Sequence, residues 1–446
     1  MAWSQVSARR WERPADGMES WFALTESASA AVCDGRRQFT IFTKIQVDLN
    51  IPSDRLESCL KEAWTQLRYE QPQIATIQEG MTKVYEVPDE AVLQAWIAST
   101  FIISAAANGE ELHANAAPID QATLYYLPGS SELVLRAPHD TVDGTGMILL
   151  LDRFLRALVS PPEEGKITFG DEPSRLTPCL GEVLGVAEEC TPEEVARIME
   201  IFKPYLEHGA GMGHVSNLGS LPAGRCRHAR LDVPWRTTEA IVQACKAKRI
   251  SVTAAVHAAY IQTLMKHADP NRPSCHYITT GQFNLRDYLP KRAAQYAASL
   301  YYTMVPLHLE SPGSFGDTSQ AVNQYYRTTF RDDTTLLPLV PHLTRLWCAG
   351  SQTPEMQAAP VPRDAVPSSL GVIERYLQRS YGDGTVTVRD FMMATDALGV
   401  TMLVFSSFRD QLQMVYSYND GHQEREHIQQ YLQDILAVLT EELLAD

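Results

Sequence analysis

The chain has 446 residues, 45% of them apolar and 21% charged, and a formal net charge of −16 at neutral pH. This length exceeds the roughly 250 to 300 residues at which a single hydrophobic core usually stops growing, so we expect two domains. The negative charge, which no basic run offsets, opposes binding to nucleic acid and to an anionic membrane surface, although it does not exclude a small anionic ligand.

The eight cysteines are scattered along the chain with no CxxC spacing. This pattern fits neither a disulfide framework nor a zinc cage, so we expect reduced, mostly buried thiols and no metal. The first ten residues contain no apolar segment, and no apolar run reaches the roughly 18 residues that span a bilayer. We therefore expect a cytoplasmic protein that does not bind membranes.

The first third of the chain predicts a mixed sheet with covering helices. Residues 38–47 alternate between apolar and polar side chains, as a strand does. Residues 53–67 predict a helix with one apolar face that covers a sheet. Other expected elements are short strands at 74–77 and 83–87, a helix at 89–99 and a hairpin over 122–138. Strands and helices do not alternate regularly, which favours a mixed α/β or α+β fold over a doubly wound one.

Residues 161–224 are rich in proline and glycine and predict a crossover linker. The expected domains are therefore residues 1–160 and 225–446. The glycines at 209–213 do not form a nucleotide loop, because no strand precedes them and no Lys-Ser follows. In the second domain we expect strands at 227–233, 275–283 and 300–309, helices at 237–248, 251–264 and 315–331, a meander of 385–388, 399–405 and 411–418, and a terminal helix at 424–444.

His139 and Asp143 lie between the predicted strand 131–138 and an apolar segment, 147–155, that predicts a buried helix. Both therefore fall in one strand-to-helix turn. A neutral imidazole can take a proton from a hydroxyl near pH 7, so His139 is a candidate general base. The structural alternative is that His139 ends the strand by bonding a backbone carbonyl, while Asp143 and Gly144 only make the turn.

Residues 139–144, HDTVDG, resemble the HxxxDG motif of the acyltransferase superfamily that includes chloramphenicol acetyltransferase, the plant BAHD enzymes and condensation domains. Residues 284–290, NLRDYLP, are similar to the segment whose arginine pairs with the motif aspartate. Residues 11–14, WERP, and 368–371, SSLG, resemble fungal acyltransferases of the trichothecene O-acetyltransferase type. The DFGWG motif of the plant enzymes is absent, which removes the plant subgroup.

The resemblance implies two chloramphenicol-acetyltransferase-like lobes, each a mixed sheet with covering helices, that meet at a central tunnel. His139 would be the general base, with no acyl-enzyme intermediate. Asp143, Gly144 and Arg286 would support the turn, with Arg286 reaching it from the second lobe. The expected oxyanion or tunnel residues are Thr303, Ser368, Ser369, Tyr301 and Tyr302, together with backbone amides near Gly144.

The resemblance further implies a monomer that moves an acyl group, in the first instance acetyl, from acyl-CoA to a hydroxyl of a small, largely apolar secondary metabolite. Acyl-CoA would be a co-substrate, with no bound cofactor. The alternative is a condensation-like enzyme that takes a thioester from a carrier protein, or catalyses a cyclisation, with the same histidine. A third interpretation is a non-catalytic relative that binds a hydrophobic ligand. Such a protein would not need the intact motif, so the motif weighs against this interpretation. No carrier or adenylation segment is recognised, which favours diffusible acyl-CoA.

Overall fold

The computed structural model describes residues 2–161 and 167–445, which form two compact units. Unit 1 contains the chain up to Ala187 together with Asn284–Tyr302 and Ile373–Asp396. Unit 2 contains Glu188–Phe283, Thr303–Val372 and the chain from Ala397. The division differs from the expected boundaries at 160 and 224, because two segments of the second half pack with the first. Residues 162–166 of the expected linker lie outside the described residues.

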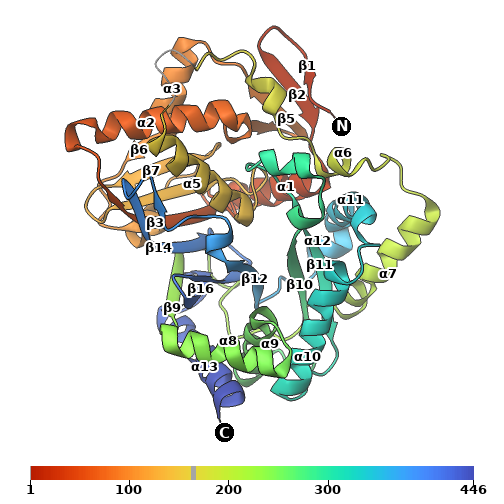
Figure 1. Ribbon diagram of the computed structural model, residues 1–446. Coiled ribbons are helices and arrows are strands. Elements are labelled where there is room, and N and C mark those ends of the chain that lie inside the picture. Colours follow the sequence, from red (N-terminus) through yellow and green to blue (C-terminus); the bar gives the residue numbers. More distant parts are fainter. Residues whose placement is uncertain (1, 162–166, 446) are drawn as a thin grey trace. The chain divides into compact units, whose positions relative to one another are not determined.

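A six-stranded sheet forms the centre of unit 1 (Figure 1). Its neighbouring strands are antiparallel except for β6 and β7, which are parallel. The hairpin expected at 122–138 is confirmed as β7 and β8. The order across the sheet is β13 (Ser380–Tyr381), β14 (Val386–Thr395), β3 (Ile41–Leu49), β8 (Glu132–Ala137), β7 (Thr123–Leu127) and β6 (Phe101–Ile103).

Helix α5 (Gly144–Val159) packs on β3 and β14, and α2 (Ser53–Glu70) packs against α5. The apolar face predicted for residues 53–67 is buried there through Leu60, Trp64 and Leu67. The remaining helices of the unit are α1 (Gly17–Val32), α3 (Glu90–Thr100), α4 (Gly109–Asn115) and α6 (Leu180–Leu184).

A smaller antiparallel sheet completes unit 1, in the order β1 (Ser4–Gln5), β2 (Arg10–Pro14), β5 (Thr82–Glu86) and β4 (Ile77–Glu79). The strand expected at 74–77 is wrong for most of its length. Residues 72–75 form a 3₁₀ turn, and only Ile77 enters a strand. Pro72 at the start of that turn fixes a backbone angle that suits a helical turn, which explains the difference.

Unit 2 is built on the four-stranded sheet β12 (Ala365–Val372), β15 (Thr401–Phe408), β16 (Gln411–Asn419) and β9 (Cys226–Asp232). Strands β12 and β15 are parallel and the other pairs antiparallel. Strands β10 (Tyr277–Asn284) and β11 (Tyr302–Leu309) form a separate pair, and their residues Asn284 and Tyr302 belong to unit 1.

Helix α13 (Arg425–Leu444) packs on β9 and β16 and against α8 (Trp235–Lys248) and α9 (Val252–Lys266), as Figure 1 shows. The small side chains of α9 permit this close packing, since Ala254, Ala255, Ala258 and Ala259 are fully buried. The other helices of unit 2 are α7 (Pro192–His208), α10 (Phe315–Tyr326), α11 (Val340–Ser351) and α12 (Pro354–Ala358).

The expected meander is wrong in its first strand. Only β15 and β16 pair with each other, whereas β14 pairs with β3 in unit 1, in a register that sets Phe391 opposite Ile45. Strand β14 is buried along most of its length, which suits the interior of a sheet covered by a helix and not an edge. The sequence therefore identified the strand correctly but not its partner.

The fold class is confirmed, since each unit combines a mixed sheet with covering helices. All eight cysteines are free thiols, and Cys275 is the exposed one. Among the described residues, no helix is both long and apolar enough to cross a membrane.

Candidate active site

The turn between β8 and α5 carries the predicted site. Asp143 is the N-cap of α5, and its carboxylate accepts the N–H of Gly146 at 2.7 Å. The N–H of Asp143 donates in turn to the carbonyl of Ser299 at 3.1 Å. The aspartate therefore ends the strand-to-helix turn and starts the helix, as an N-cap aspartate does.

The Asp143 carboxylate also pairs with Arg286. Nη1 of Arg286 lies 2.9 Å from both carboxylate oxygens, and the N–H of Tyr301 donates to Oδ2 at 2.9 Å. Nη2 of Arg286 donates to Ser299 Oγ at 2.8 Å. The expected pairing is present, but Arg286 belongs to the same unit as the motif and does not reach it from a second lobe.

Removing one partner of this pair should be costly. The side chains of Asp143 and Arg286 are 3% and 11% exposed, so each single replacement by alanine leaves a nearly buried charge without its partner. We expect Asp143→Ala and Arg286→Ala each to lower the free energy of unfolding by about 3 to 5 kcal/mol. Urea denaturation followed by circular dichroism measures this.

The matched control is Lys61→Ala, which removes the exposed ion pair between Lys61 and Glu57. It should cost less than about 1 kcal/mol. If the Asp143 and Arg286 variants were no less stable than this control, the buried pair would not form in solution.

Two aromatic rings lie next to the imidazole of His139. The Phe22 ring stacks on it with a centroid distance of 3.9 Å and an interplanar angle of 8°, and the Tyr302 ring lies 5.6 Å away. Nδ1 is buried and has no hydrogen-bond partner among the described residues, whereas Nε2 is neither buried nor hydrogen-bonded there. Nε2 is therefore the accessible nitrogen of this ring.

Burial lowers the pKa of His139 to about 4, although its own carbonyl oxygen and the carboxylates of Asp143 and Asp140 act in the opposite direction. The imidazole is therefore neutral at pH 7 and able to accept a proton. Because the pKa in the folded protein lies below the ordinary value, the unfolded chain takes up the proton first. The stability that this group contributes is lost as the pH falls from about 6.5 towards 4.

Selective ¹³C labelling of histidine and NMR titration measure this pKa directly. An ordinary imidazole is about 90% protonated at pH 5.5, because its pKa is about 6.5. We expect His139 to remain neutral at pH 5.5, with its signal assigned by its loss in His139→Asn. A midpoint near 6.5 would contradict the buried environment described above.

Gly146, two residues beyond the motif, is the glycine that the packing requires. A Cβ atom there would lie 2.5 Å from Val142 Cγ2 and 2.6 Å from the carbonyl oxygen of Ala297. The second atom belongs to the backbone and cannot move aside cheaply. Gly144, predicted as the structural glycine, opens α5 and does not have a positive φ.

We therefore expect Gly146→Ala to reduce soluble yield strongly and to lower the melting temperature, because the new methyl overpacks the turn. Gly129→Ala is the matched control, since a Cβ at Gly129 would meet nothing within 4 Å. Thermal denaturation of both variants tests this. Equal melting temperatures would show that the turn relaxes around the methyl.

The other predicted residues take different places. The Tyr301 hydroxyl donates to the carbonyl of Pro178 at 3.0 Å, which makes this side chain structural. Tyr302 lies beside His139, as described above.

Thr303 belongs to unit 2 and is fully buried, with an Oγ1 that lacks a partner among the described residues. Ser368 and Ser369 are also in unit 2, on β12, and Ser369 Oγ lies 2.9 Å from Thr253 Oγ1. Their roles as oxyanion donors stay predictions.

Four buried residues around the turn were not predicted from the sequence. Phe22 and Glu26 come from α1, Lys83 from β5 and Asp140 from the motif itself. Lys83 Nζ lies 3.1 Å from Asp140 Oδ2 and is fully buried. The acidic Asp140 inside the motif was a signal that a buried cation lies nearby, since a buried carboxylate needs a partner.

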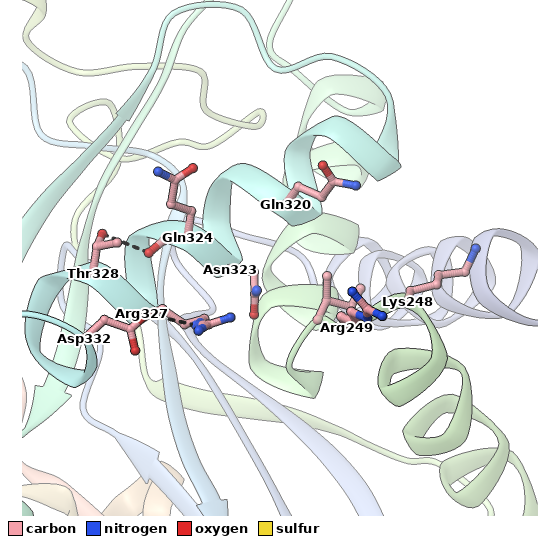
Figure 2. Close-up of a pocket in the computed structure, with 9 residues that line it drawn as sticks. Lys248, Arg249, Gln320, Asn323, Gln324, Arg327, Thr328 and Asp332 are labelled. Atoms are coloured by element: carbon pink, nitrogen blue, oxygen red, sulfur yellow. Dashed lines mark hydrogen bonds and ion pairs between the residues drawn. The ribbon is translucent and has the colours of Figure 1, made fainter.

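A hollow of about 300 Å³ lies in unit 2, where α8 ends and α10 passes (Figure 2). Lys248, Arg249 and Arg327 line it, and Asp332 pairs with Arg327 at 3.1 Å. The excess of positive charge in an acidic chain would suit an anion.

One group of described side chains has the spacing of metal ligands. Cys190, Glu194 and His342 bring one ligand atom each to within 4.8 Å of one another. Arg345 donates to Nδ1 of His342 at 3.1 Å, so the proton of the neutral ring stays on Nε2 and a cation lies close to the group. Both features oppose metal binding.

Known proteins resemble the chain in sequence and in fold. No family model matches the chain. The first condensation domain of the calcium-dependent antibiotic synthetase superposes with a TM-score of 0.67 at 14% identity, over 96% of each chain. The trichothecene 15-O-acetyltransferase TRI3 of Fusarium sporotrichioides superposes with a TM-score of 0.83 at 17% identity, over 99% of this chain and 98% of that one. The chain therefore shares its fold with an acetyltransferase and with a condensation domain.

Curated relatives of the chain include fungal acetyltransferases. O-acetyltransferase pigM of Monascus ruber is 26% identical in an alignment of 454 positions that covers 99% of this chain and 87% of pigM. Acetyltransferase pigO of the same fungus is 29% identical in an alignment of 340 positions that covers 73% of each chain. The chain is a homologue of these enzymes, and acyl transfer is the activity that they support.

Proposed function

We propose that the protein is an O-acyltransferase that moves an acetyl group from acetyl-CoA to a hydroxyl of a small, largely apolar secondary metabolite. The observation that carries the proposal is an imidazole whose Nε2 has no hydrogen-bond partner among the described residues, on a turn that a buried ion pair holds. The lowered pKa of this imidazole agrees with the role of a base. A base and a rigid support for it are the two parts that direct acyl transfer needs from a protein.

His139 Nε2 accepts the proton of the acceptor hydroxyl as the oxygen attacks the thioester carbonyl. The resulting imidazolium then gives this proton to the departing thiolate, so that no acyl-enzyme forms and the histidine ends neutral. The carboxylates of Asp143 and Asp140 raise the pKa of His139 against the effect of burial, and so they favour the transient imidazolium. Asp143 itself stays bound to Arg286 and only holds the turn.

The relatives support the choice of acyl group and acceptor. Both pigM and TRI3 are O-acetyltransferases, and TRI3 acetylates a trichothecene. An acetyl donor and a hydroxyl acceptor follow by analogy for this chain. Acetyl-CoA is a co-substrate in this proposal.

The second candidate is a condensation-like enzyme that uses a carrier-bound thioester, or a cyclisation with the same histidine. The fold is compatible with it, since a condensation domain superposes over nearly the whole chain. The greater similarity to an acetyltransferase, with a TM-score of 0.83 against 0.67, favours the first candidate.

The test is to incubate the protein with acetyl-CoA and a panel of hydroxylated metabolites and to measure free thiol. We expect acceptor-dependent thiol release, and a fall of at least about 100-fold in His139→Ala, because positioned general bases contribute about 10² to 10⁴ in rate. His427→Ala is the matched control, since its side chain is 77% exposed.

Residual activity of His139→Ala within a few-fold of the parent would contradict the general-base role. Silence with acetyl-CoA, together with turnover of a carrier-bound thioester, would support the second candidate instead.

A further inference from the structure

Helix α1 contacts the turn through two residues one helical turn apart. Phe22 and Glu26 have the spacing that places side chains on one face of a helix, and both are almost fully buried, at 2% and 3% exposure. They meet His139 in different ways, one at its ring and the other at its backbone.

The Phe22 ring is itself held in place. It packs edge-to-face against Phe39, at a centroid distance of 5.9 Å and an angle of 89°, and its face lies parallel to the imidazole of His139. A ring fixed on one face by stacking can rotate less about its side-chain bonds. Phe22 therefore restricts the orientations that the imidazole ring can adopt.

Glu26 fixes the backbone of the same residue. Its Oε1 accepts the N–H of His139 at 3.0 Å and the N–H of Asp140 at 3.4 Å. Without this acceptor, these N–H groups would lack a hydrogen-bond partner at the buried start of the turn, which costs about 1 to 3 kcal/mol for a buried donor.

The position of Glu26 disfavours the charged form of its carboxyl group. Lys83, the buried cation of the site, forms its ion pair with Asp140 and not with Glu26. Burial and the Asp140 carboxylate raise the pKa of Glu26 to about 8, while Arg37 and Lys83 lower it in part. Among the described residues, the hydrogen bonds of the Glu26 side chain go only to the two N–H groups of the turn.

We propose that α1 positions the imidazole of His139, with Phe22 fixing the plane of the ring and Glu26 fixing the backbone that carries it. Both are positioning residues, because neither needs to touch substrate to act. The proposal rests on the proposed function, in which the direction of Nε2 determines the rate. A misplacement of about 1 Å can reduce catalysis by about 100-fold.

The first test compares Glu26→Ala with Glu26→Gln. Glutamine keeps an oxygen at the end of the side chain and loses only the ionisable group, so it should still accept from the His139 N–H. We expect Glu26→Ala to lower kcat at least about 10-fold with KM within about 3-fold, and Glu26→Gln to restore kcat to within about 3-fold of the parent.

A second readout does not depend on turnover. The ring current of Phe22 shifts the His139 Cε1 proton, so the histidine NMR spectrum of the free protein reports the stacking. We expect this signal to move in Glu26→Ala and to stay in place in Glu26→Gln. Phe22→Leu should abolish the ring-current shift and lower kcat while KM stays within about 3-fold.

The matched control is Ser29→Ala. Ser29 lies on the same helix, and its Oγ accepts the N–H of Gln38 at 2.8 Å and donates to the backbone carbonyl of Glu26 at 2.9 Å. This variant therefore removes hydrogen bonds of α1 but leaves the contacts of the Glu26 carboxyl group with the turn in place. We expect it to lower the melting temperature while kcat and the His139 signal stay unchanged. A lower melting temperature with unchanged kcat in this variant would show that a general weakening of the helix does not by itself reduce activity.

An unmoved His139 signal and an unchanged kcat in Glu26→Ala would overturn the proposal, as would equal losses in the alanine and glutamine variants. Failure of the proposed function gives a different result. In that case His139→Ala would keep its activity, whereas the NMR comparison of the Glu26 variants would still report whether α1 holds the imidazole.

Discussion

The Asp143 carboxylate is the interaction on which the rest of the site depends. It accepts hydrogen bonds from the start of α5, from the guanidinium of Arg286 and from the backbone of Tyr301. The start of α5 and a region more than 130 residues further along the chain are therefore held at one pair of oxygen atoms. Since an unpaired buried charge is costly, arrangements of the turn that break these contacts are disfavoured.

Helix α1 makes a second set of contacts with the turn. Asp143 caps the start of α5, whereas Phe22 and Glu26 contact His139. The imidazole is then left with one accessible nitrogen and a neutral charge at pH 7. Burial keeps the ring unprotonated at pH 7, but it also lowers the affinity of the ring for a proton. The nearby carboxylates would therefore have their largest effect on the protonated ring, which they stabilise.

The pairing of Asp143 with Arg286 was predicted from the family resemblance, and hydrogen bonds join the two side chains. The role of His139 as a general base stays a prediction. The sequence was insufficient for Phe22 and Glu26, since the burial of a helix face depends on what packs against it. The pairing of β14 with β3 was missed for a similar reason: alternation predicts a strand but carries no information about a partner more than 300 residues away. Arg286 was assigned to the wrong unit because composition does not reveal a chain that passes back and forth between two cores.

This interleaving of the chain has a consequence for biosynthesis. Strand β14 lies inside the sheet of unit 1, between β13 and β3, yet it is made only after most of unit 2. While the ribosome completes the intervening residues, at about 5 to 20 residues per second, one edge of β3 stays unpaired. An open apolar edge of this kind attracts other strands. Newly made chains should therefore depend on chaperones until residue 395 has emerged, and a protein truncated before β14 would retain that exposed edge permanently.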